Sequence, residues 1–294
     1  MDRLLFGDNQ FFGVNHMSEE KARSQSMRFR DTQAIIDVLD KAYDNGIRTF
    51  MCTTHDRMDT ICEHIKTHPG RYSEFQFYPC MPYAHKYANA VGQLGLLGTL
   101  KKYAPGSMMG AMFQGAMSAV NKDIYRMMKL LVDTEMKNFD GVKTPVVYLQ
   151  NVVTDLLLGL GLNDMFRAFY DHVREKYDAE PAFITMNLPR LLDALDECEI
   201  DNPIVCSSIN KIGFRMCGGI DLYEEVIAER KFRCVAMSIF ASGAIPAEEA
   251  IKYICQHERI ESVVFGASSE KNIRNTKELF EQYTVKSSKQ EQTA

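Results

Sequence analysis

The sequence has no run of lysine or arginine residues, and its formal net charge is -5. A nucleic-acid surface needs clustered positive charge, because binding depends on displacing the counterions that surround the phosphates. We therefore expect no nucleic-acid partner, and small molecules are the favoured ligands.

Long apolar runs are missing as well. The longest apolar region, 146–162, is interrupted by polar residues, so it is not predicted to be a membrane-spanning helix. The first residues change from apolar to acidic by Asp8, without the apolar run of a secretory signal. The sequence thus predicts a cytoplasmic protein with no membrane partner.

Paired cysteine spacings are absent too. The eight cysteines are scattered along the chain with no CxxC pair. This pattern predicts neither a disulfide framework nor a zinc site built from paired ligands. We expect buried, reduced thiols and no bound metal.

What the chain does contain is a regular alternation of short β-branched or aromatic runs with helical stretches. The predicted strands are 4–12, 47–53, 75–80, 145–152, 182–187, 203–210, 234–240 and 262–266. Such alternation is typical of parallel strands joined by crossover helices, and about eight units predict a single (β/α)8 TIM barrel. We assign the barrel to residues 1–284 and a flexible C-terminal tail to 285–294, which has little to bury.

The first predicted helix illustrates the pattern. Asp31 and Thr32 can cap it, apolar residues then recur at helical spacing, and Asn45-Gly46 stops it.

The connection between the third and fourth predicted strands is anomalous. About sixty residues separate them, whereas a barrel needs a short loop and one helix. Residues 121–139 have the periodicity of an ordinary crossover helix, so the insertion is about 81–120, with a Met-rich stretch at 108–117. It follows the carboxyl end of a strand, the face that holds barrel active sites. We expect an extra helical layer or a homo-oligomer interface, with a substrate lid as the alternative.

Four segments resemble the aldo-keto reductases, in the right order and at barrel spacing. They are Ala42–Met51 (AYDNGIRTFM), Ala182–Asn187 followed by LPRLL, Ala236–Gly243 (AMSIFASG) and Val263–Ser269 (VVFGASS). The resemblance covers nearly the whole chain except the insertion and the tail, and it implies the same barrel. Its implied activity is reduction of a carbonyl group with a nicotinamide cofactor.

The residues that carry that reaction in the family are not matched. The resemblance places the family's Asp, Tyr, Lys and His at Met51, Asp56, Cys80 and Asn151. A methionine cannot orient a lysine, and a thiol cannot lower the pKa of a phenol as an ammonium group does. The sequence therefore departs from the standard mechanism.

The cofactor positions are partly retained. The resemblance places NADP or NAD against Asn187 and two loops, with Met237 in place of a stacking tyrosine and Asn272 in place of a 2′-phosphate arginine. The loop residues are Ser238, Ser242, Gly243, Gly266, Ser268 and Ser269. Because the second loop leads directly into a helix, its N–H groups and hydroxyls can also hold a phosphate.

Polar residues at the carboxyl ends of barrel strands point into one shared bowl. We select His55 and Asp56 as acid/base candidates, since they supply a group that titrates near neutrality and a carboxylate beside it. Asn151 joins them as a catalytic candidate. The predicted substrate-binding residues are Gln10, His16, Cys80, His85, Gln150 and Asn210, and Asp8 and Asn9 belong to the same strand-end series. Structural roles for both His55 and His16, as a helix cap and a loop residue, remain open.

These observations favour an enzyme that acts on a small polar metabolite, as a non-standard NAD(P)-linked oxidoreductase. Two alternatives stay open. One is a non-catalytic barrel that binds a ligand or dinucleotide as a sensor or complex subunit. The other is an isomerase, lyase or hydrolase that uses acid/base or metal assistance.

Overall fold

The structure, a computed structural model, describes residues 1–15, 17–83 and 120–291; of these, the side chains of 120–124 and 285–291 are left undescribed. Residues 84–119 of the predicted insertion, which include the Met-rich stretch with the expected homo-oligomer contact and His85, therefore lie outside the described residues, and so does His16.

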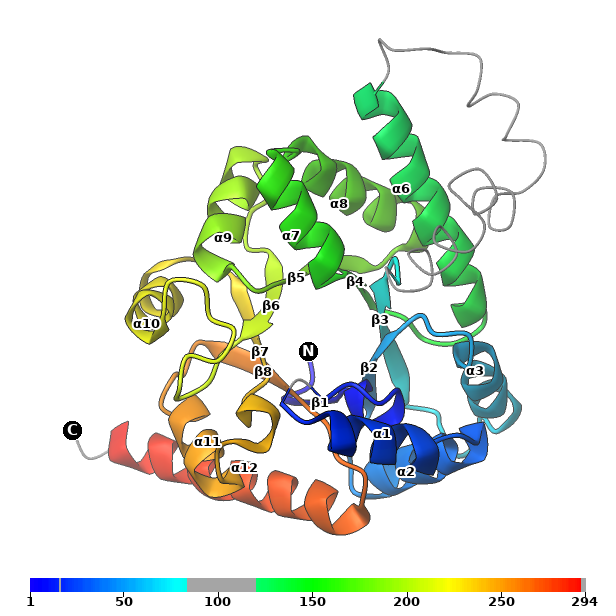
Figure 1. Cartoon of the computed structure of the whole chain (residues 1–294), viewed down its shortest axis with the longest axis vertical. Helices are drawn as coiled ribbons and strands as arrows, with labels where there is room; N and C mark the ends of the chain where they lie inside the picture. The colour runs from blue at the N-terminus through cyan, green and yellow to red at the C-terminus, as the bar shows by residue number, and fades with distance from the viewer. Residues whose placement is uncertain (16, 84–119, 292–294) are drawn as a thin grey trace.

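Eight parallel strands form a closed barrel in sequence order, with β8 pairing back onto β1 (Figure 1). The strands are β1 (Leu4–Phe6), β2 (Thr49–Thr53), β3 (Gln76–Met81), β4 (Val146–Leu149), β5 (Glu180–Thr185), β6 (Ile204–Ser208), β7 (Arg233–Met237) and β8 (Ile260–Phe265). The predicted TIM barrel is confirmed, and each predicted strand coincides with an observed one.

Several strands are shorter than predicted, and for two of them the local reason is clear. The expected strand 4–12 ends at Phe6, because residues 9–11 turn into a 3-10 helix. The expected strand 145–152 ends at Leu149, because a helix begins at Asn151. Apolar residues such as Phe11 continue the run in the sequence, but Phe11 is buried from a helical turn rather than from a strand.

Helices surround the barrel and connect its strands (Figure 1). They are η1 (Asn9–Phe11), α1 (Glu19–Arg28), α2 (Thr32–Asp44), α3 (Met58–Thr67), α6 (Val120–Met136), η2 (Lys137–Phe139), α7 (Asn151–Leu160), α8 (Asp164–Tyr177), α9 (Leu188–Glu197), α10 (Ile220–Glu229), η3 (Ala241–Gly243), α11 (Ala247–Ile254) and α12 (Glu270–Glu291).

The predicted caps of α2 are confirmed: the Asp31 side chain accepts a hydrogen bond from Gln33 N, and Asn45 is the C-cap. The crossover helix expected at 121–139 corresponds to α6 and η2. The helix α12 continues to Glu291, into the segment predicted to be a flexible tail. Among the helices of the described ranges, none combines the length and apolarity needed to cross a membrane.

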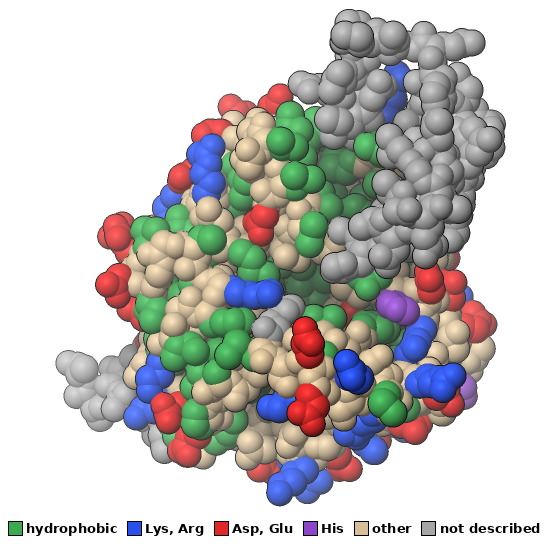
Figure 2. Space-filling model, viewed as in Figure 1, with side chains coloured by type: hydrophobic (Ala, Val, Ile, Leu, Met, Phe, Trp, Pro, Cys, Tyr) green, Lys and Arg blue, Asp and Glu red, His purple; other side chains and the backbone are tan. Residues whose placement is uncertain are grey.

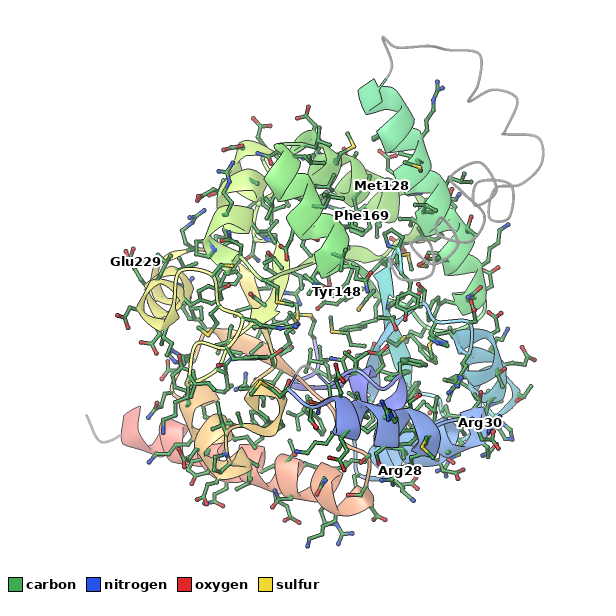
Figure 3. The ribbon with its side chains drawn as sticks, viewed as in Figure 1. Arg28, Arg30, Met128, Tyr148, Phe169 and Glu229 are labelled. Carbon is green, nitrogen blue, oxygen red and sulfur yellow. The ribbon has the colours of Figure 1, made fainter. Side chains whose placement is uncertain are left out.

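The core has an inner and an outer part. Tyr148 lies inside the barrel, whereas Met128 and Phe169 pack between the strands and the helices α6 and α8 (Figure 3). At the amino end of the barrel, Arg233 at the start of β7 pairs with Glu180 and with Glu261 at 2.9 Å. The opposite end carries the loops that follow the carboxyl ends of the strands, the face that holds barrel active sites.

Gly13 holds the connection from η1 to α1 close to that helix. Its φ is +66°, and an added Cβ would lie 2.8 Å from the carbonyl oxygen of Ala22. We predict that Gly13→Ala lowers the free energy of unfolding by about 1–3 kcal/mol, because both the backbone conformation and the contact disfavour a side chain.

Urea denaturation measures this effect, and Gly70→Ala is the matched control, since nothing lies within 4 Å of a Cβ there. Equal stabilities of the two variants would contradict the account.

Candidate functional site

A cavity of about 840 Å³ opens at the carboxyl ends of the strands. Its floor consists of apolar side chains from the barrel interior: Met51, Cys80, Ile184, Met237 and Val264. Its wall combines polar and apolar side chains and comes mainly from the loops after β1, β4, β7 and β8. In the space-filling view hydrophobic atoms surround the hollow in the middle of this face (Figure 2). Size and character match those of small-molecule sites.

Asp8 brings a buried carboxyl group to this cavity. Its side chain is 7% exposed, and its Oδ2 accepts hydrogen bonds from Thr53 N at 2.7 Å and Thr53 Oγ1 at 2.6 Å. Both bonds end on Oδ2, which leaves Oδ1 as the oxygen that can meet a ligand. Burial raises the pKa of Asp8, and the hydrogen bonds from Thr53 oppose that rise. Asp8 is therefore suited to exchange a proton with a bound molecule.

Tyr83 and Cys80 line the same side of the cavity. Burial raises the pKa of Tyr83, and the charge of Asp8 adds to the effect. The Tyr83 backbone N–H donates to both carboxylate oxygens of Glu135 at 3.1 Å, which fixes the chain after β3. Burial also raises the pKa of Cys80 well above its usual range, so its thiol stays protonated and is no nucleophile at neutral pH.

Eight of the residues that the sequence predicted for the site line the cavity: Gln10, Cys80, Gln150, Asn151, Ser238, Ser242, Gly243 and Gly266. Gln10 is packed against Gly266, since a Cβ added to that glycine would lie 2.3 Å from Gln10 Oε1. Gln10 Nε2 also donates to Gly7 O at 2.7 Å. The absence of a side chain at Gly266 thus makes room for Gln10.

His55 and Asp56 are not among the cavity-lining residues. The His55 ring stacks on Phe12, which does line the cavity, with centroids 4.2 Å apart and planes 11° apart. His55 Nδ1 accepts a hydrogen bond from Arg57 N at 3.3 Å, at the start of α3, and Asp56 is exposed. His55 therefore lies behind the ring of Phe12, and neither His55 nor Asp56 lines the cavity.

Asn187 and Asn210 also stand outside the cavity lining, because the backbone uses their side chains. Asn187 is the N-cap of α9 and accepts from Arg190 N at 3.4 Å. Asn210 is fully buried and holds the Phe214 backbone. Ser268 and Ser269 lie at the start of α12, where Ser269 Oγ accepts from Asn272 N at 3.4 Å.

The residues at the positions of the family's reactive groups are brought together only in part. Met51, Cys80 and Asn151 line the cavity, whereas Asp56 does not. Two of these four residues, Asp56 and Cys80, can ionise. Asp56 is exposed, and the thiol of Cys80 is buried and unreactive. The carboxyl group that lines the cavity is instead that of Asp8, in the loop after β1.

The loops after β7 and β8 form the part of the cavity wall next to the loop that carries this carboxyl, because β8 pairs with β1. Ser238, Ala241 and Ser242 all have positive φ, which directs the loop backbone around the cavity edge. Beyond them, Asn272, Asn275 and Thr276 of α12 add neutral polar side chains. This wall, next to a helix N-terminus, has the groups that hold phosphate or ribose hydroxyls.

The described residues contain neither a cluster of metal ligands nor a disulfide. Within residues 1–15, 17–83 and 120–291, no group of three His, Cys, Asp or Glu side chains is placed to hold a metal ion. Of the eight free cysteines, six are buried as predicted, Cys198 is half-buried and Cys217 is exposed.

No family model matches the chain, and no curated protein matches its sequence. Solved structures do match, among them a putative aldo-keto reductase from Pseudomonas aeruginosa at TM-score 0.58 and 12% identity, covering 96% of this chain and 90% of that one. Aldose reductase from Giardia lamblia gives 0.56 at 12%, covering 95% and 87%. An aldo-keto reductase from Bacillus halodurans, in its holo form, gives 0.53 at 12%, covering 97% and 91%. The chain therefore has the aldo-keto reductase fold.

The raised pKa of Asp8 gives a pH-dependent prediction. Above the ordinary aspartate pKa of about 3.9, Asp8 ionises in the unfolded chain but keeps its proton in the folded one up to its raised pKa. The folded state then binds more protons, so wild-type stability falls as pH rises through this window. Asp8→Asn cannot ionise, so its free energy of unfolding relative to wild type should rise with pH and then level off.

Urea denaturation between about pH 4 and pH 8 measures this difference. A difference that is flat or falls with pH would mean that the pKa of Asp8 is not raised in the folded state, so that its hydrogen bonds outweigh the effect of burial.

Proposed function

We propose that the protein is an oxidoreductase that binds a nicotinamide dinucleotide and a small polar substrate in this cavity, and that transfers the proton through Asp8 instead of the family's tetrad. The observation that carries the proposal is the division of the cavity into an apolar floor, a neutral polar wall by α12 and one buried carboxyl.

The chain's residues fit a dinucleotide on the wall formed by the β7 and β8 loops. Ser238, Ser242 and Gly243 would contact its phosphates, and Asn272 and Thr276 the ribose end near the start of α12. The apolar floor, with Met237 at the end of β7, suits a flat nicotinamide ring. The bound nucleotide would supply the hydride.

Asp8, in the loop after β1 that lines the same cavity, would hold the proton. Its Oδ2 is fixed by Thr53, which restricts the carboxyl to one orientation. Its raised pKa brings it closer to neutral pH, where a general acid or base works best. Gln150 and Asn151, at the end of β4, would orient the polar group of the substrate.

A second candidate function is acid/base isomerisation or elimination without a hydride, and the buried Asp8 carboxyl is the observation that favours it. The two candidates share the cavity and the proton carrier. They differ in the requirement for a nucleotide, so nucleotide binding separates them.

We expect NADPH or NADH to bind saturably and to raise the thermal midpoint, as followed by nucleotide fluorescence and thermal unfolding together. Asn272→Asp should weaken NADPH binding at least about tenfold, because the ribose end of NADPH carries the 2′-phosphate and a carboxylate beside it adds like-charge repulsion. Asn202→Asp is the matched control, since Asn202 is exposed and precedes β6 at the opposite end of the barrel.

Wild-type protein that binds neither nucleotide up to millimolar concentration would exclude the redox function and leave the isomerase candidate.

The acid/base role has its own prediction. With a substrate found by screening carbonyl compounds, Asp8→Asn should lower kcat at least about a hundredfold. His55→Ala should lower kcat less, because His55 does not line the cavity and contacts it through the rings of Phe12 and Tyr83.

Steady-state kinetics of the two variants decide whether Asp8 or His55 is the acid/base residue. The reverse order, with His55→Ala the more damaging, would return the acid/base role to the His55–Asp56 pair.

A further inference from the structure

Two charged side chains line the cavity within the described part of the chain. One is the buried Asp8, and the other is Arg215, which is exposed and comes from the loop between β6 and α10. In a chain with a formal net charge of -5, an anion is attracted only where positive charge is local. Arg215 supplies that charge at the cavity.

The loop that carries Arg215 is anchored on both sides of it. Asn210 Nδ2 donates to Phe214 O at 2.8 Å, and Asn210 Oδ1 accepts from Phe214 N at 2.8 Å. After Arg215, Met216 is buried, and its sulfur accepts from Asn210 N at 3.4 Å. Because both neighbours are held by one buried asparagine, the position of the arginine is fixed by the fold.

The backbone at Arg215 adopts a conformation that favours glycine. Its φ is +57°, in the left-handed region that disfavours a residue with a Cβ. Gly213, Gly218 and Gly219 of the same loop also have positive φ, so glycine is the residue this loop uses elsewhere for such turns. Strained positions that keep a large side chain cluster at binding sites.

The guanidinium group is oriented but not neutralised. Its Cζ lies 5.5 Å from the centre of the Phe214 ring, which limits its directions. Within the described residues it forms no ion pair with a carboxylate, whereas Lys211 of the same loop pairs with Glu249 at 2.8 Å. The charge of Arg215 therefore remains for a ligand.

We infer that Arg215 is the anion-recognition residue of the cavity, and that the ligand presents a carboxylate or phosphate group to it. A guanidinium offers two parallel N–H donors that match either group. The anionic group belongs either to a small acidic substrate or to the phosphates of the nucleotide. The assignment of the anionic group to a substrate or to a nucleotide rests on the proposed function. The binding of an anion by Arg215 does not.

The test uses the full-length protein and isothermal titration with malonate, inorganic phosphate and NADPH at constant ionic strength. Arg215→Gln should weaken binding of the recognised anion at least about tenfold, and Arg215→Lys should keep part of it. Lys211→Gln is the matched control, since it removes the same charge from the same loop. Arg215→Gly removes the cation and suits the positive φ, so it should lose anion binding without loss of thermal stability.

Weaker malonate or phosphate binding with NADPH unchanged would assign the anion to the substrate. Weaker NADPH binding would assign it to the nucleotide. Malonate binding that depends on Arg215 in a protein that binds no nucleotide would support the anion site while the proposed redox function fails. Wild-type affinities for all three probes in Arg215→Gln, or equal losses in Lys211→Gln, would overturn the inference.

Discussion

Closure of the barrel is the constraint on which the rest of the structure depends. The short strand β1 pairs with β8 through Leu4–Val263, Leu5–Val264 and Phe6–Phe265. This pairing places the first loop of the chain beside the last one, so that Gln10 fills the space above Gly266. The cavity exists because residues from the two ends of the chain meet there.

At the carboxyl ends of the strands, acidic side chains accept hydrogen bonds that connect neighbouring segments of the barrel. Asp8 after β1 accepts from Thr53 of β2, and Asp155 of α7 accepts from Thr185 Oγ1 at 2.5 Å and Met186 N at 3.1 Å after β5. Glu135 of α6 joins the chain after β2 to that after β3. These bonds satisfy backbone groups where strands end, and they make the edge rigid. In Asp8 the same carboxyl that bridges two strands also faces the cavity.

The architecture could be predicted from the sequence because it depends on periodicity. Alternating apolar runs gave the eight strands, and Asp31 and Asn45 gave the ends of α2. Site residues were harder to choose, because a polar residue at a strand end serves the backbone as readily as a ligand. Asn187 and Asn210 were selected for the site, yet their amides hold a helix end and a loop.

The residues that sequence reasoning missed depend on long-range packing. Asp8 was visible at a strand end, but only its burial and its bonds to Thr53 distinguish it from its exposed neighbour Asn9. No sequence motif marked Arg215, because its place at the cavity depends on the hydrogen bonds that Asn210 forms with the backbone of Phe214. Three of the four positions that the resemblance singles out, Met51, Cys80 and Asn151, line one cavity. It contained no information on which other carboxyl would share that cavity.

We propose that Asp8, which follows β1, supplies the ionisable group of this site. The most direct measurement is a pH titration by NMR of the Asp8 side-chain carbon in protein labelled at aspartate carboxyls, assigned by its loss in Asp8→Asn, with and without NADPH. The account predicts a pKa above the ordinary aspartate value of about 3.9 and a resonance that shifts when NADPH binds. An ordinary pKa and a resonance that does not respond to the nucleotide would contradict it.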